Sequence, residues 1–182
     1  PFRLALSFGL QALGFAGLAQ ALPRIRSMYG ESQPQNGRFV GPSAPQSKLR
    51  CPMDFTGEDE VTSEDGVHGL ARVSRHAGLW SFAAVMAGAA VATPSVPQAA
   101  FLSMPVLVAL VGGGHQDSRS RRGIGPAIPP EYEAKTSSVP FFAMLTGAQG
   151  GSAFSNLYSE TKLANAALGV CLAAFLAAGR LR

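Results

Sequence analysis

The apolar residues of this chain are gathered into four blocks that contain no charged residue and are separated by polar segments. A helix needs about 20 apolar residues to cross a bilayer. We therefore expect an all-α integral membrane fold with about four transmembrane helices, at Leu4–Leu22, Ala77–Thr93, Ala99–Gly114 and Leu163–Gly179. The third block is the shortest and contains Pro105, which predicts a short kinked or tilted span. A buried core helix of a soluble protein is the alternative for the first block.

The segments between the blocks differ in length and composition. Residues 27–66 are rich in Gly, Pro, Ser, Gln and charge, so they predict an extended loop, either mobile or laid over a partner protein. The short uncharged segment 93–98 joins the second and third blocks into an antiparallel hairpin. Thr136–Gly147 is too short to span and contains Pro140, which favours an interfacial or half-buried segment.

These patterns divide the chain into a first transmembrane helix (1–26), an extended loop (27–66), a core with the transmembrane hairpin (67–147), and a linker with the last transmembrane helix (148–182). Small residues in the first two blocks suit close helix contact in lipid, namely Gly9, Gly14, Gly17, Ala84 and Gly88. The chain begins at Pro1 without an initiator Met, so we expect a processed or trimmed form that has lost any targeting peptide.

Charged residues make up only 14% of the chain, against about a quarter in soluble domains, which supports a membrane location. The net charge of +4 comes from basic residues at the ends of the apolar blocks, so we interpret it as topology and exclude a nucleic-acid partner. The positive-inside rule places these residues at the cytosol, stroma or matrix, opposite both termini. They are Arg24, Arg26, Arg72, Arg75, Arg119, Arg121 and Arg122. For Arg119, Arg121 and Arg122 we expect a second role in binding anionic lipid headgroups.

Motifs for soluble-enzyme chemistry are absent from the sequence: there is no phosphate loop, nucleophile elbow, HExxH or paired-Cys metal motif. We therefore assign no catalytic or metal-ligating residue. His76 and His115 each lie where an expected span meets its basic loop. An imidazole at that depth can ligate heme iron, and two from adjacent helices can form a bis-His site. The alternative is a hydrogen-bonded interfacial His, or a ligand to a pigment contributed by a partner.

Four ordered motifs between Gly69 and Gly147 resemble the NnrU family, the membrane family that includes 15-cis-zeta-carotene isomerase of plants and algae. The motifs are Arg75-His76-Ala77, Asp117-Ser118-Arg119 with Arg121-Arg122, Tyr132-Glu133, and Thr136-Ser137-Ser138-Val139-Pro140-Phe141-Phe142-Ala143. The resemblance makes 67–147 an NnrU-like core. It implies His76 as the best candidate ligand of heme b. His115 is a weaker candidate from its position alone, and a chlorophyll or carotenoid shared with a partner is the alternative to heme.

Two departures from that family change the functional prediction. Ala77 stands where the family has Pro, and no second His occurs in Ala83–Ala92, where the family usually carries one. The isomerase also has an extra amino-terminal pair of spans with a His that looks like a heme ligand, and this chain has one span before its long loop.

We therefore predict a non-catalytic accessory subunit of an organellar membrane complex, with other membrane subunits, lipids and pigments as its partners. The first choice is a photosystem I and antenna complex of the plastid thylakoid, with the basic loops on the stromal side. A respiratory complex of the mitochondrial inner membrane, with those loops in the matrix, comes second. The alternative function is a heme-dependent cis-trans isomerase of the zeta-carotene type, which interconverts the cis and trans forms of a double bond.

Overall fold

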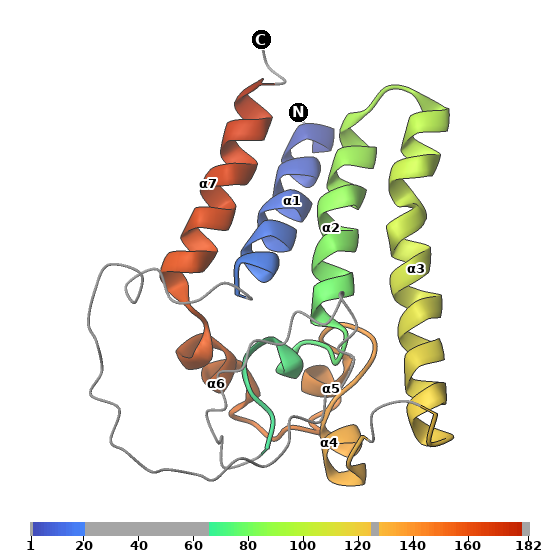
Figure 1. Cartoon of the computed structure of the whole chain (residues 1–182). Coiled ribbons are helices and arrows are strands. Elements are labelled where there is room, and N and C mark those ends of the chain that lie inside the picture. Colours follow the sequence, from blue (N-terminus) through green and yellow to red (C-terminus); the bar gives the residue numbers. More distant parts are fainter. Residues whose placement is uncertain (1, 21–65, 125–127, 180–182) are drawn as a thin grey trace, which may run out of the picture.

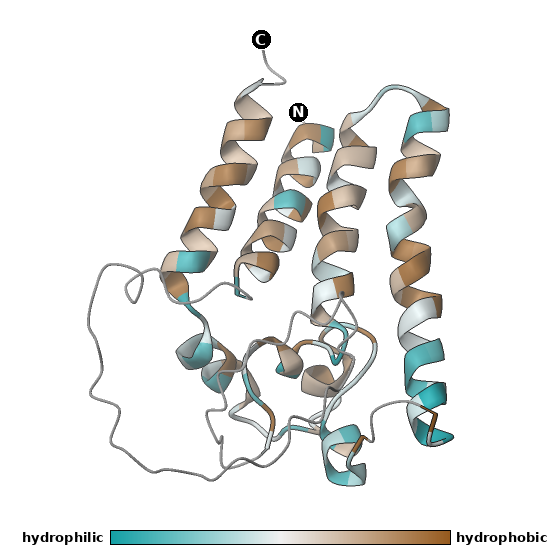
Figure 2. Cartoon of the chain, in the orientation of Figure 1, coloured by the Kyte–Doolittle hydropathy of each residue, from teal (hydrophilic) through white to brown (hydrophobic). Residues whose placement is uncertain are grey.

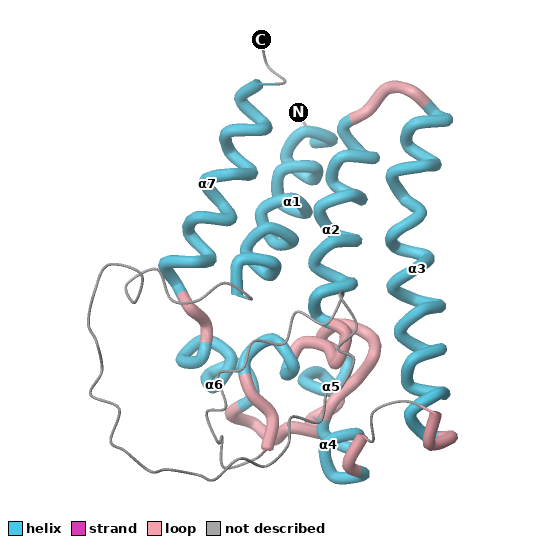
Figure 3. Tube along the Cα trace, viewed as in Figure 1, coloured by secondary structure: helices cyan, strands magenta, loops and turns pink. Residues whose placement is uncertain are grey.

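The described part of this computed structural model, residues 2–20, 66–124 and 128–179, contains helices and no strand (Figure 3). Four helices are long: α1 (Phe2–Gln20), α2 (Ala77–Ala92), α3 (Val96–Arg121) and α7 (Leu163–Gly179). Four are short: η2 (Gly69–Arg72), α4 (Pro130–Lys135), α5 (Phe142–Leu145) and α6 (Ala153–Glu160). The all-α prediction is confirmed for these residues.

The four long helices stand side by side in one row, in the order α7, α1, α2, α3 (Figure 1). Each packs closely only on its neighbours in the row. The start of α1 (Phe2) and the end of α7 (Gly179) lie at the upper end of the helices, and the short helices lie below the lower end (Figure 1). Arg72, Arg75 and Arg121 lie in η2, just before α2 and at the end of α3, which is the lower end of the helices, opposite the described ends of the chain. Their place on one side of a membrane remains a prediction.

The expected spans agree with the helices to different degrees. The helix bounds predicted for the last one are confirmed, and the hairpin of the second and third is confirmed by the neighbouring α2 and α3. The third was predicted too short, because α3 continues to Arg121 through Gly112, Gly113 and Gly114. Gly113 packs closely against His76 within the helix, and Pro105 also lies inside α3. Residues 21–65, which include Arg24, Arg26 and most of the expected loop, lie outside the described residues.

Length and composition make α1 and α3 candidates to cross a membrane. A third candidate arises if α7 is taken together with α6, from which it is bent by 82°. The helix α2 is apolar but shorter. These apolar helices are compatible with a membrane protein, and crossing by all four remains a prediction.

Small residues allow the helices of the row to approach closely. A Cβ atom on Gly88 of α2 would lie 2.7 Å from the carbonyl oxygen of Ser7, and one on Gly169 of α7 would lie 2.5 Å from the backbone nitrogen of Ala16. Gly14 and Gly17 pack against α2 in the same way, whereas Gly9 faces open space. The prediction of small-residue contacts is thus confirmed for Gly14, Gly17 and Gly88.

Buried polar side chains join the same helix pairs. The hydroxyl of Ser7 donates to the carbonyl oxygen of Gly88 at 2.7 Å, and the amide of Asn165 donates to the carbonyl oxygen of Ala19 at 3.0 Å. Close backbone approach combined with interhelical hydrogen bonds is the usual way in which helices associate in lipid, where apolar burial between helices gives little driving force. The packing mode therefore fits an apolar surrounding.

Candidate functional site

The candidate ligand His76 is the residue immediately before α2, and its imidazole is used to join α2 to α3. Its Nε2 lies 2.9 Å from Oδ1 of Asp117 on α3, and the other carboxylate oxygen, Oδ2, accepts from Nη2 of Arg75 at 2.8 Å. All three side chains are about nine-tenths buried. One carboxylate thus holds an imidazole and a guanidinium, which we name the Asp117 cluster.

The motif that begins at Thr136 closes over this cluster. The carbonyl oxygen of Ser138 accepts from Nε1 of Trp80 at 2.7 Å and from the hydroxyl of Ser74 at 2.8 Å. The carbonyl oxygen of Ser137 accepts from the backbone N–H of Arg75 at 2.9 Å. These two backbone carbonyl groups are therefore satisfied by residues before α2 and in its first turn, which agrees with a half-buried segment that does not cross.

Gly113 provides the room for the imidazole at the α2–α3 crossing. A Cβ atom at this position would lie 2.8 Å from Cδ2 of His76 and 2.9 Å from the hydroxyl oxygen of Ser138. Any side chain on residue 113 would collide with the ring. The glycine run that looks like the end of a helix therefore lies inside α3, and its middle residue is a packing position.

The charged turn before Thr136 completes the base of α3. Oε1 of Glu133 on α4 accepts from Nε of Arg121 at 2.7 Å and lies 3.8 Å from Nη1 of Arg75. Glu133 therefore links the end of α3 to the entry of α2. All four motifs of the family resemblance meet here, within one network of ion pairs and hydrogen bonds.

A second buried ion pair anchors α6 below the row. Nη2 of Arg72 lies 2.6 Å from Oε1 of Glu160, and Nε of Arg72 lies 2.8 Å from Oε2, which also accepts from the backbone N–H of Gly69 at 2.6 Å. Burial opposes ionisation of the Glu160 carboxyl, but these hydrogen bonds outweigh it and lower its pKa. Arg72 is fully buried, so this pair fixes η2 to the end of α6, which two residues separate from the start of α7.

The geometry of His76 does not fit an axial heme ligand. Heme-binding His usually coordinates iron through Nε2, and here that nitrogen points at the carboxylate of Asp117 while Gly113 packs against the ring edge. His115 is exposed and lies two residues from Gly113, on roughly the opposite side of α3 at about 100° per residue. The structure therefore does not bring His76 and His115 together. The hydrogen-bonded alternative for His76 agrees with this contact, and heme ligation by either histidine stays a prediction that the structure does not support.

The three arginines expected at lipid headgroups are all exposed at the lower end of α3 but differ in their partners. Arg121 pairs with Glu133, whereas neither Arg119 nor Arg122 pairs with a carboxylate of the described residues. Nε of Arg122 donates to the carbonyl oxygen of Ser118 at 3.2 Å. Among the described residues, Arg119 and Arg122 therefore have no acidic partner, whereas Arg121 has one.

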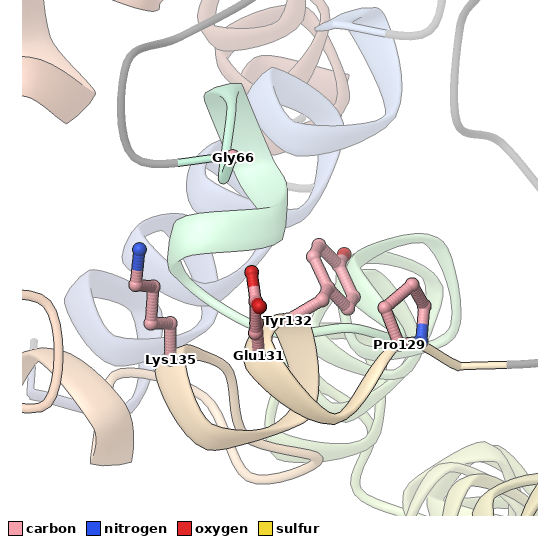
Figure 4. A pocket seen from close by; sticks show the side chains of 5 residues that line it. All are labelled: Gly66, Pro129, Glu131, Tyr132 and Lys135. Carbon is pink, nitrogen blue, oxygen red and sulfur yellow. The ribbon is translucent and has the colours of Figure 1, made fainter.

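An open depression of about 410 Å³ lies beside α4, lined by Gly66, Pro129, Glu131, Tyr132 and Lys135 (Figure 4). None of the predicted site residues lines it. It is a surface hollow with one carboxylate and one amine, which is not a set of groups that defines a reaction. We therefore take the Asp117 cluster as the candidate site.

No protein-family model, curated protein or solved structure matches this chain. The resemblance to the NnrU family therefore remains a prediction. Sequence reasoning identified Arg75, His76, Asp117 and Glu133 as motif residues but did not pair them. It missed Glu160, whose one signal is a single carboxylate directly before the last apolar block.

Proposed function

We propose that this chain is a non-catalytic structural subunit of a multi-subunit membrane complex. The observation that carries the proposal is the single row of long helices, which leaves apolar side chains exposed on both of its faces. Leu6 and Phe8 of α1 illustrate this, because residues two apart lie on nearly opposite sides of a helix and both are more than a third exposed. A single layer cannot bury both faces by itself.

The polar base supports the same proposal. Figure 2 shows hydrophilic residues gathered at the lower end of α3 and on α4 and α6, below a largely hydrophobic row. The side chains there that could take part in chemistry are His76, Asp117 and Arg75. Asp117 contacts both of the others and joins the start of α2 to α3. We interpret the Asp117 cluster as an interhelical contact that fixes α2 and α3 relative to each other. A subunit placed between neighbours requires such a fixed shape.

The resemblance adds the finer proposal that the complex is a photosystem I and antenna assembly of the thylakoid, with a mitochondrial respiratory complex as the second candidate. Neighbouring subunits and their pigments would then cover the faces of α1 and α7. Large exposed apolar side chains on α7, such as Leu172 and Phe175, give that surface the chemistry of such contacts.

Native purification tests the proposal. The source membranes are extracted in a mild detergent, resolved on a native gel, and probed for this chain. We expect it at the mass of a large complex, with the same companion subunits in each preparation. Migration of the chain alone would overturn the proposal, and an absorption band of bound heme in the purified chain would favour an isomerase instead.

A further inference from the structure

The outer edge of the row, formed by α3, carries a continuous stripe that changes from apolar to basic. Phe101, Met104, Val108 and Val111 recur at intervals of three and four residues and are each more than half exposed. His115, Arg119 and Arg122 continue the same spacing toward the lower end and are exposed as well. The buried residues Ala109, Gly113 and Asp117 occupy the opposite side, against α2.

We infer that this stripe binds one anionic phospholipid, with its acyl chain along the apolar part and its phosphate at Arg119 and Arg122. Charge complementarity selects this occupant: the two guanidinium groups have no carboxylate partner among the described residues, and Asp117, the acidic residue of α3, is buried on the other side. An apolar protein surface would leave both cations without a counter-charge. An anionic lipid satisfies both parts of the stripe.

The dimensions of the stripe agree with one leaflet. At about 1.5 Å per residue, the apolar part from Phe101 to Val111 is roughly 15 Å long, which is close to half of the ~30 Å hydrocarbon core. Arg119 and Arg122 then fall at the depth of the phosphate groups. The imidazole of His115, between the two parts, can donate a hydrogen bond to a phosphate or ester oxygen.

Arg121 provides a matched control. It belongs to the same helix end and carries the same charge, but it pairs with Glu133. The sequence alone groups it with Arg119 and Arg122, and the structure separates it from them. If an anionic lipid were attracted only by the basic charge of this helix end, all three arginines would contribute equally to its binding. Binding along the stripe depends on two of them, Arg119 and Arg122.

The test measures lipid binding to the purified full chain in detergent by native mass spectrometry. The probes are phosphatidylglycerol and phosphatidylcholine with identical acyl chains. We expect phosphatidylglycerol to bind at least tenfold more tightly. Arg119→Gln and Arg122→Gln should each weaken it about fivefold, as expected for one arginine at an anionic surface, while Arg121→Gln should not. Arg119→Lys should retain most of the binding.

Three results would overturn the inference: equal binding of both lipids, equal weakening by Arg121→Gln, or equally tight binding of glycerol 3-phosphate, which lacks acyl chains. A dimer that forms through α3 without lipid, seen in the same spectra, would also overturn it. Because the isolated chain is measured, the outcome does not depend on whether the proposed complex exists.

Discussion

Nε2 of His76 and Oδ1 of Asp117 lie 2.9 Å apart although the two residues are 41 positions apart in the chain. The contact joins the start of α2 to the lower third of α3, and the same carboxylate holds Arg75. His76, the candidate cofactor ligand, therefore has a structural role: it joins α2 to α3 and contributes to the stability of the fold.

Asp117→Asn should destabilise the chain strongly. The substitution removes the charge that holds the buried guanidinium of Arg75 and weakens the bond to His76, so we expect a loss of about 3 kcal/mol, typical of a broken buried pair. Denaturation of the purified chain in detergent measures it. Glu131→Gln, an exposed carboxylate on α4, is the control and should change stability by less than about 0.5 kcal/mol. Equal stability of the two variants would contradict this prediction.

Gly113→Ala should destabilise the chain by a packing collision, although alanine has the higher helix propensity. The new methyl group collides with His76 and Ser138, so we expect a loss of about 1–3 kcal/mol. Gly114→Ala is the matched control, because its Cβ meets open space. That variant should be neutral or gain up to about 1 kcal/mol from better helix propensity. If both variants are stabilised, the close contact between α2 and α3 is wrong.

Gly169→Ala should loosen the last helix from the first. Its Cβ would lie 2.5 Å from backbone atoms of Phe15 and Ala16, which cannot move aside as a flexible side chain can. We expect a loss of about 1–3 kcal/mol in the same denaturation assay. Gly179→Ala, at the end of α7 and in open space, serves as control. An unchanged midpoint for Gly169→Ala would rule out the tight crossing.

Stability should depend on pH through Glu160. Because its pKa in the folded chain lies below the usual 4.5, ionised Glu160 stabilises the fold above about pH 4.5, and this contribution is lost as the pH falls through the folded value. Glu160→Gln should cost about 1–3 kcal/mol at neutral pH, since hydrogen bonds to charged groups are lost. The variant should also lose less stability than the parent on acidification. Parallel pH profiles for the two chains would refute the role of this pair.

Much of the fold could be predicted from hydropathy. The apolar block of α7 has polar residues before it and basic residues after it, so the bounds Leu163–Gly179 followed directly. The length of α3 could not be predicted, because Gly112–Gly114 is a local signal for a helix end. In the folded chain Gly113 instead packs against His76 inside the helix, and a local pattern does not contain this contact.

The candidate site was predicted in its residues but not in its geometry. Motif spacing indicated Arg75, His76 and Asp117, yet which side chain contacts which depends on how α2 and α3 cross. Depth along the helix made His115 look equivalent to His76. Their positions around the helix axes distinguish them, because one faces the α2–α3 contact and the other faces outward.

Photo-cross-linking in the source membranes tests the central claim, that the row is a structural element between neighbouring subunits, most directly. A photoreactive amino acid is placed at Phe8 and, in a second variant, at Leu6, which are exposed on nearly opposite sides of α1. A third variant carries it at Val108 on the outer edge of α3. We predict protein adducts at Phe8 and Leu6 that contain different subunits, and lipid adducts at Val108. Lipid adducts alone at all three positions would contradict the account.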